Sequence, residues 1–315
     1  MREIKRVLKS NNFILFMLMI IIIVVFGLFN PIFLKSANLI QYFNNGVVLS
    51  FLALGLSATI ITGNFDFSVG SMTGFGTVIM AIALKNGVPL VLSLLIGFIS
   101  LVLFGVLNGL VVGFLKVPGM LGTLGVSSLI YGIALVLTGG HAVASGSEAY
   151  KFFGKSDIGT LPFGIILLAV VFVISLLLLN YSPWGRRLYL IGSSPEVARF
   201  TGISYKKEVL LVHVYSSIMC FFGALILGSH MASGRADVGE VYILQAVTAS
   251  VLGGISIKGG KGSITGALLG AMIATLLSSG FTIINMSQYY KQVVMGTLLI
   301  VILFIRNYRL IFNKL

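Results

Sequence analysis

Apolar residues occur in long runs along the whole chain, and short polar or glycine-rich stretches separate one run from the next. A helix that crosses a bilayer needs about 20 mostly apolar residues to span about 30 Å of hydrocarbon. The runs therefore predict an all-α, polytopic membrane protein with about ten transmembrane helices in a single domain, residues 1–315. The ten predicted segments are 12–29, 43–62, 68–84, 88–111, 120–138, 161–180, 209–229, 241–257, 263–284 and 292–305.

Basic residues are distributed unequally between the two sides of this predicted bundle. With the N-terminus inside, alternating segments place 15 of the 21 Lys and Arg residues on the inner side and 6 on the outer side. Loops rich in Lys and Arg remain in the cytoplasm. The bias therefore predicts that both termini are cytoplasmic. The six outer residues are Lys35, Lys85, Lys151, Lys155, Arg235 and Lys291.

The composition agrees with a membrane protein and excludes several other classes. Hydrophobic residues make up 57% of the chain and charged residues 9%, which is too little charge to cover a soluble domain. The net charge of +13 does not indicate nucleic-acid binding, because the excess lies in short loops. The single cysteine, Cys220, rules out an intramolecular disulfide framework.

The stretch GNFDFSVG, residues 63–70, places the carboxylate of Asp66 between two long apolar runs. A carboxylate at mid-bilayer costs about 3 kcal/mol on insertion scales. The flanking glycines favour a broken or re-entrant helix, which survives at membrane depth only inside protein or beside water. Asp66 either caps, together with Ser68, the helix that begins near residue 68, or it contacts a substrate. The capping role is favoured.

The long inner loop, residues 181–208, contains a short predicted helix in the sequence SSPEVARFTGI. Ser194 is a suitable N-cap, and Pro195 occupies the first helical position. Glu196 favours the positive end of the helix, and Gly202 ends it. A helix of about two turns is not stable alone. It either docks into a groove of a partner or packs on its own bundle, and the pattern leaves the two alternatives equal.

A predicted outer segment, SHMASGRADVGE, gathers His230, Arg235, Asp237 and Glu240 near one face of the membrane. These side chains either pair with one another or contact a docking protein outside. On charge alone, a solvated loop is the favoured interpretation.

No set of residues indicates catalysis, nucleotide binding or a metal site. The sequence GGISIKGGKGS departs from the phosphate-binding loop pattern at Ile255 and Gly262. His213 lies in an apolar segment, and no second histidine stands at metal-ligand spacing. No nucleophile–base arrangement and no paired carboxylates occur. The chain is therefore predicted not to be an enzyme.

Five longer motifs follow one another in a specific order: GNFDFSVGSMTG (63–74), GVLNGLVV (105–112), LGTLGVSSLIYGIALVLTGG (121–140), GSSPEVARFTGIS (192–204) and VLGGISIKGGKGSITGALLGA (251–271). Together they resemble the bacterial ABC importer permeases of the ribose, monosaccharide and autoinducer-2 type. The resemblance covers roughly residues 35–305. It departs from the family at Phe65-Asp66-Phe67, where Ile-Asp-Leu is usual, and in the stretch PGMLGTLG, where the family has bulkier residues.

The resemblance implies a type II-like permease in the bacterial inner membrane that pairs with a second permease subunit, identical or related. It implies a cytoplasmic ABC ATPase below and an extracytoplasmic solute-binding protein above, with ATP and Mg²⁺ held by the ATPase and no cofactor in this chain. It also favours docking for the short helix of the 181–208 loop. The residues that match the family's ATPase-coupling helix are Ser194, Pro195, Glu196, Ala198, Arg199 and Gly202.

These inferences predict the permease subunit of an ATP-driven importer of a monosaccharide, a small polyol or an autoinducer-2-like solute, which works by alternating access. The substrate path is expected at the interface between two subunits. The alternative is a secondary transporter driven by an ion gradient, which requires ionisable residues deep in several helices. Asp66 is almost alone in such a position. The residues predicted near the path are Asp66, Ser68, Asn108 and Gln245.

Overall fold

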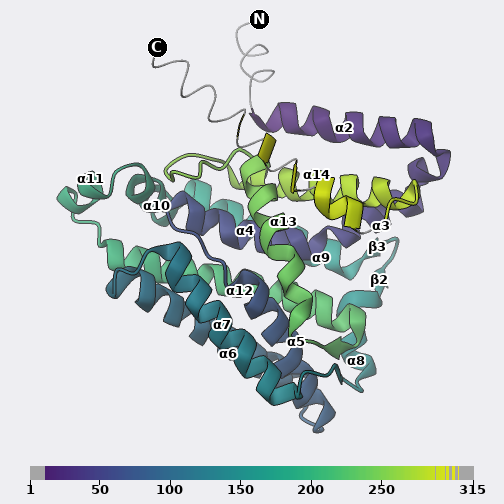
Figure 1. Cartoon of the computed structure of the whole chain (residues 1–315), viewed down its shortest axis with the longest axis horizontal. Coiled ribbons are helices and arrows are strands. Elements are labelled where there is room, and N and C mark those ends of the chain that lie inside the picture. The colour runs from purple at the N-terminus through teal and green to yellow at the C-terminus, as the bar shows by residue number, and fades with distance from the viewer. Residues whose placement is uncertain (1–10, 288, 295, 298–299, 302–303, 305–315) are drawn as a thin grey trace, which may run out of the picture.

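The computed structural model describes residues 11–287, 289–294, 296–297, 300–301 and 304. Helices dominate this part of the chain, and its strands form two short antiparallel pairs (Figure 1). The all-α prediction is therefore confirmed. The elements of the first half are α2 (Asn11–Phe29), η1 (Pro31–Leu34), α3 (Ser36–Asn45), α4 (Val47–Ile61), α5 (Val69–Lys85), α6 (Leu90–Gly109), η2 (Leu110–Phe114), α7 (Gly119–Thr138), β1 (Val143–Ala144) and α8 (Glu148–Lys155).

The second half continues the helical pattern, and its strands are β2 and β3, which form a small hairpin, and β4, which pairs with β1. The described residues between 289 and 304 are helical as well, and the rest of the predicted segment 292–305 lies outside the described residues. The elements are β2 (Asp157–Ile158), β3 (Leu161–Pro162), α9 (Phe163–Leu176), η3 (Leu177–Tyr181), α10 (Pro183–Ser193), α11 (Pro195–Phe200), α12 (Tyr205–Met231), β4 (Ser233–Gly234), η4 (Asp237–Gly239), α13 (Glu240–Leu252) and α14 (Ile264–Ile283).

The described helices differ in their ability to cross a membrane. Six are long and apolar enough to do so, or seven if α3 and α4, which are bent by 40° at their junction, form one span. α5 and α13 coincide with predicted segments but have only 17 and 13 residues. The structure thus has a multi-pass pattern in which several full-length spans accompany shorter helices.

α4 and α12 form the centre of the bundle. All 15 residues of α4 are buried, and α12 packs against α4, α5 and α6. Glycines allow these helices to approach closely. A Cβ atom on Gly105 of α6 would lie only 2.4 Å from the hydroxyl of Ser217 on α12. Small residues are the usual means of helix packing in lipid, where apolar side chains gain nothing by leaving the solvent.

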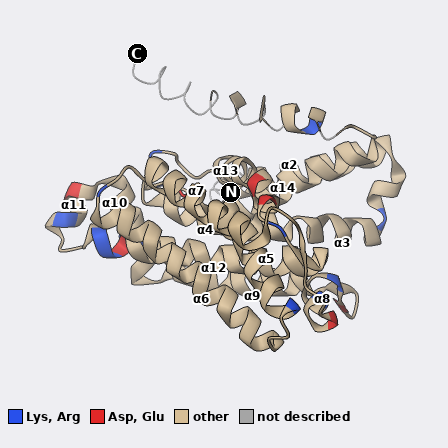
Figure 2. Ribbon diagram, turned by 60° about the horizontal axis from the view of Figure 1, so that its bottom comes forward, with Lys and Arg blue, Asp and Glu red and all other residues tan. Residues whose placement is uncertain are grey.

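Charged side chains gather mainly at two opposite ends of the bundle (Figure 2). At one end the Gly260 N–H donates to the Ile61 carbonyl at 2.8 Å, and the Asn64 amide donates to the Tyr205 hydroxyl at 3.2 Å. At the other end β1 pairs with β4 and joins the loop after α7 to the end of α12. This grouping agrees with the predicted alternation of loops. Which end faces the cytoplasm stays a prediction.

Two breaks interrupt the helical path inside the bundle. Residues 62–68 separate α4 from α5, and residues 232–239 separate α12 from α13. The second break differs from the expected solvated loop, because it packs along α5. A Cβ on Gly239 would lie 1.9 Å from the carbonyl oxygen of Gly70, and one on Gly74 would lie 2.1 Å from that of Ala236. The glycines of α5 therefore create the room for this segment.

Candidate functional site

The short helix predicted within residues 181–208 is present as α11. Ser194 has the extended conformation of an N-cap, and its hydroxyl accepts a hydrogen bond from the Val197 N–H at 3.4 Å. Pro195 is the first helical residue, and Gly202 follows the helix with a φ of +78°. The predicted start and end signals are therefore confirmed.

α11 projects from one end of the bundle (Figures 1 and 2). Of its six residues only Ala198 is buried, and Glu196 and Arg199 are exposed. Val197 is also exposed, and the Phe200 side chain is 90% exposed. The apolar side of this helix is thus turned away from its own bundle except at Ala198. A bare aromatic side chain on a projecting helix is typical of a surface that binds another protein.

A second helix, α10, precedes α11 and was not predicted from the sequence. The Ser182 hydroxyl accepts hydrogen bonds from the N–H groups of Trp184 and Gly185 at 3.1 and 3.3 Å, and Pro183 is the first helical residue. This Ser-Pro start is the same signal that marks α11 at Ser194. The signal was therefore present in the sequence.

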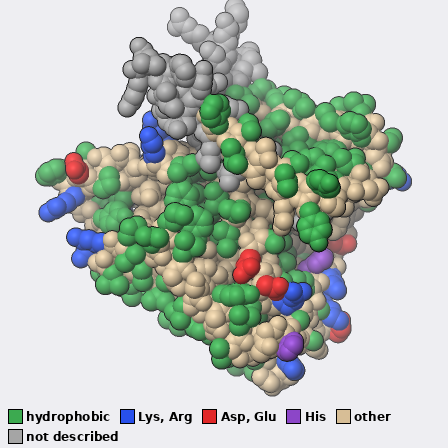
Figure 3. Space-filling model, in the orientation of Figure 1, with side chains coloured by type: hydrophobic (Ala, Val, Ile, Leu, Met, Phe, Trp, Pro, Cys, Tyr) green, Lys and Arg blue, Asp and Glu red, His purple; other side chains and the backbone are tan. Residues whose placement is uncertain are grey.

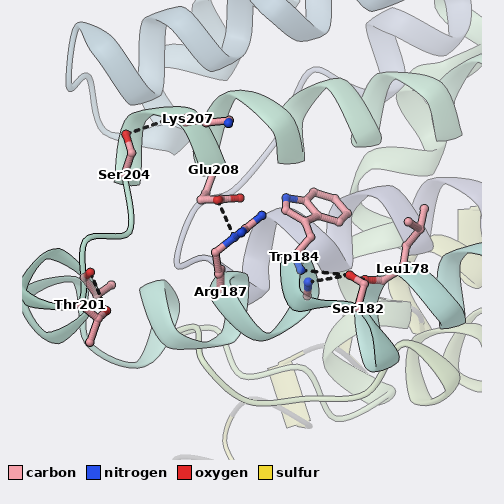
Figure 4. Close-up of polar contacts among 10 residues, drawn as sticks. Leu178, Ser182, Trp184, Arg187, Thr201, Ser204, Lys207 and Glu208 are labelled. Carbon is pink, nitrogen blue, oxygen red and sulfur yellow. Dashed lines mark hydrogen bonds and ion pairs between the residues drawn. The ribbon is translucent and has the colours of Figure 1, made fainter.

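An ion pair joins α10 to the first turn of α12 and closes the base of the loop that carries α11 (Figure 4). The Arg187 Nε atom lies 2.8 Å from Glu208 Oε1, and the Glu208 side chain is only 5% exposed. The rings of Trp184 and Tyr215 add a second contact between the same helices, with centroids 5.9 Å apart. α11 is therefore held between two helices that are fixed to each other.

Three of the four residues predicted near the substrate path meet in one fully buried network. Ser216, from the middle of α12, donates to Asp66 Oδ2 at 2.8 Å. The Ser68 N–H donates to Asp66 Oδ1 at 3.0 Å, and the Asn108 amide donates to the Ser68 hydroxyl at 2.6 Å. Asp66, Ser68, Asn108 and Ser216 are all buried. Asp66 thus links the start of α5 to α6 and α12, whereas the predicted cap differs, because Ser68, the N-cap residue of α5, makes no side-chain capping hydrogen bond.

The break that carries Asp66 is also fixed to α7. The Phe67 N–H donates to the Thr123 hydroxyl at 3.0 Å, and that hydroxyl donates to the Phe65 carbonyl at 3.2 Å. The fourth predicted path residue, Gln245, is separate from this network and lies partly exposed on α13. Sequence reasoning missed Ser216 and Thr123, because contacts between residues so far apart in the chain leave no local pattern.

The charged residues of the predicted outer segment do not form one cluster. Arg235 pairs with Asp237, with Nη2 and Oδ2 2.7 Å apart. Glu240 and His230 are exposed, and neither takes part in an ion pair within the described residues.

Among the described residues, neither a metal-ligand group nor the buried histidine adds a candidate functional site. Across the part of the chain that the structure describes, no group of three His, Cys, Asp or Glu side chains could hold a metal ion. His213 is buried, and its Nδ1 atom lies 2.8 Å from the Val209 carbonyl oxygen. Its Nε2 atom is buried without a hydrogen-bond partner among the described residues.

Comparison with known proteins identifies a family. The family model described as the permease component of the branched-chain amino acid transport system matches residues 38–303. The ribose import permease protein RbsC of Bacillus subtilis is 30% identical over 91% of this chain and 89% of its own length. The autoinducer 2 import system permease protein LsrD of Escherichia coli K12 is 30% identical over 90% of this chain and 88% of its own length.

A third relative, the ribose import permease protein RbsC of Haemophilus influenzae, is 27% identical over 93% of this chain and 92% of its own length. No solved structure matches the chain. The relatives and the apolar helices together identify a multi-pass protein of the bacterial inner membrane. The chain belongs to the permease-component family of ABC importers that includes the ribose and autoinducer-2 permeases.

Proposed function

We propose that this chain is the membrane-spanning subunit of an ATP-driven importer for a monosaccharide or a related small polyol, including autoinducer-2-like solutes. Two such subunits, identical or related, form the path between them and alternate between outward-open and inward-open states. A cytoplasmic ABC ATPase supplies the energy and holds ATP and Mg²⁺. An extracytoplasmic binding protein delivers the solute. The relatives named as ribose and autoinducer-2 permeases support this class of substrate.

The observation that carries the proposal is the geometry of α11. It is a capped helix whose apolar residues Val197 and Phe200 are exposed at one end of the bundle. Arg187 and Glu208 tie the helices on either side of it together. A partner protein that binds α11 and moves it will therefore also move α12. Ser194, Pro195 and Gly202 set the ends of this docking helix, as the resemblance implies.

Movement of α12 reaches the centre of the subunit through Asp66. Ser216 lies about two turns after Glu208 on the same helix, and its hydroxyl binds the Asp66 carboxylate. Asp66 and Thr123 hold the break at residues 62–68 between α12 and α7. In this proposal Asp66, Ser68 and Asn108 position α5 relative to α6 and α12, and none of them touches the solute. Gln245 remains a residue of the path.

The proposal is tested by reconstituting the chain in proteoliposomes with its cognate ATPase and binding protein. Uptake of labelled pentoses, hexoses and autoinducer-2 is then measured with and without ATP. We expect accumulation of at least one of these solutes only when ATP is present on the ATPase side. Accumulation by the chain alone, energised by a sodium or proton gradient, would establish the alternative of a secondary transporter.

A matched pair of charge reversals tests the docking role of α11. Arg199→Glu reverses an exposed charge in the last turn of α11, and Lys155→Glu does the same in the last turn of the short helix α8 at the opposite end. We expect Arg199→Glu to abolish co-purification of the ATPase and ATP-driven uptake, and Lys155→Glu to leave co-purification unchanged. Equal co-purification by both variants would refute docking at α11.

A further inference from the structure

The chain between α12 and α13 buries small side chains and exposes charged ones, with buried and exposed residues alternating over 234–237. Three small residues, Gly234, Ala236 and Gly239, are buried against α5, as the close approaches to Gly70 and Gly74 require. The residues exposed on the other side are charged: Arg235, Asp237 and Glu240. This segment therefore binds the bundle with one side and presents carboxylates and a guanidinium on the other.

The segment begins at the end of the bundle where β4 pairs with β1 and runs beside α5 toward the middle of the bundle. α13 has 13 residues, so it covers about 20 Å of a hydrocarbon layer about 30 Å thick. The Gly253 carbonyl, just after the C-terminal end of α13, accepts a hydrogen bond from Asn11 at the start of α2. About 10 Å of the crossing therefore remains for the chain before Glu240. That chain runs beside α5 from Thr77 to Gly70.

α5 also provides a hydrogen-bond partner for backbone groups of the segment at Arg235. The Arg235 N–H donates to the Thr77 hydroxyl at 3.1 Å, and this hydroxyl lies 3.2 Å from the Arg235 carbonyl oxygen. Non-helical backbone occurs at membrane depth only where it is buried in protein or lines a water-filled cavity. The Thr77 contact shows that the buried side of the segment is covered by protein.

The exposed side cannot face lipid without a large cost, because charged side chains are expensive in hydrocarbon. Figure 2 shows acidic residues beside α13. In Figure 3 acidic and basic side chains lie together on a face where hydrophobic side chains dominate. Arg235 and Asp237 are paired and about half exposed, and Glu240 has no ion-pair partner among the described residues. The side that carries these groups must therefore meet water.

We propose that residues 232–240 line the outer half of the water-filled substrate path, with Asp237 and Glu240 facing the passage. This inference rests on the proposed transport function and names the segment through which the solute passes. Carboxylates and a guanidinium offer hydrogen bonds that replace the hydration of a neutral, polyhydroxylated solute. The path is thus assigned to residues other than Asp66, Ser68 and Asn108, which are buried in the packing network.

The test uses the single buried cysteine of the chain, Cys220. In a Cys220→Ser background, Asp237→Cys and Glu240→Cys are each introduced and the importer is reconstituted with its ATPase. A membrane-impermeant, charged methanethiosulfonate is added from outside. Leu103→Cys serves as the matched control, since Leu103 is 62% exposed in the middle of α6 but, being apolar, is expected to face lipid. The unsubstituted background shows any labelling of other groups.

We expect both introduced thiols to react at least about tenfold faster than Leu103→Cys, because only a thiol in water forms the reactive thiolate. Rates at both positions as slow as that of Leu103→Cys, in a transporter that still shows ATP-driven uptake, would overturn the assignment and leave the proposed function intact. Fast labelling of the introduced thiols together with uptake that does not depend on ATP would overturn the proposed function, while the lining role of the segment would stand.

Discussion

Arg187 Nε and Glu208 Oε1 lie 2.8 Å apart and join α10 to α12 across the loop that carries α11. Glu208 is almost fully buried, so a change at Arg187 leaves its side chain without its ion-pair partner. We expect Arg187→Gln to destabilise the subunit by about 1–3 kcal/mol, since a buried carboxylate loses its charged partner. The apparent melting temperature of the purified subunit is measured through the reaction of Cys220, which a thiol-specific dye reaches only after unfolding.

The double variant Arg187→Gln with Glu208→Gln provides the control for this prediction. It removes both charges together, so it should regain part of the stability that the single change loses. If the separate effects of Arg187→Gln and Glu208→Gln on the melting temperature simply add in the double variant, the ion pair does not couple α10 to α12.

Asp66 accepts hydrogen bonds from both the backbone and the hydroxyl of Ser68, and from Ser216. We expect Ser216→Ala to cost about 1 kcal/mol, the usual net value of one hydrogen bond. Asp66→Ala should cost several times as much, because it leaves several buried polar groups without a partner. Asp66→Asn keeps one acceptor and should fall between them. The yield of monodisperse subunit after detergent extraction orders the three variants.

The opposite result would assign a different role to Asp66. If Asp66→Asn assembles like the unaltered subunit but prefers a different sugar, the carboxylate contacts the solute during transport.

Two helical glycines allow a matched test of how residues 232–239 pack on α5. A Cβ on Gly74 of α5 would lie 2.1 Å from the Ala236 carbonyl oxygen, whereas one on Gly132 of α7 would meet nothing within 4 Å. We expect Gly74→Ala to prevent folding of the subunit. Gly132→Ala should stabilise it by up to about 1 kcal/mol, because alanine favours the helix over glycine. Melting of both variants gives the comparison, and normal melting of Gly74→Ala would contradict the packing of residues 232–239 on α5.

Phe200 is expected to dominate the affinity of α11 for its partner. It is 90% exposed, so Phe200→Ala should leave the melting temperature unchanged. Aromatic anchors at interfaces contribute about 2 kcal/mol or more, which corresponds to a loss of about 30-fold in affinity for the ATPase. Val136→Ala, at another strongly exposed apolar position, is the control and should bind normally. Unchanged affinity of the Phe200 variant, measured by titration in detergent, would exclude it from the interface.

Local signals in the sequence predicted the ends of α11 correctly. The cap at Ser194, the proline at the first helical position and the glycine at positive φ act within a few residues of the helix they define. The Asp66–Ser68 contact is similarly short in range. Its partner Ser216 lies 150 residues away, and only the packed helices bring the two together.

The charged residues between α12 and α13 are exposed as expected, but sequence reasoning missed the packing of this segment on α5. The charges of Arg235, Asp237 and Glu240 gave it the character of a solvated loop. The informative residues were the small ones between these charges, which pack against the glycines of α5. Hydropathy averages over neighbours and therefore hides small buried residues that stand between exposed charges. The burial of Glu208 was missed for a related reason, because a single acidic residue next to two lysines is typical of the exposed first turn of a helix.

Only Ala198 among the six residues of α11 is buried. Changes at the other five positions therefore meet little resistance from the stability of the subunit itself. Under the proposed docking role, the residues of α11 that contact the ATPase lie in a stretch that the fold of the subunit constrains little. We therefore expect substitutions at these exposed positions to change the affinity for the ATPase without changing the stability of the subunit.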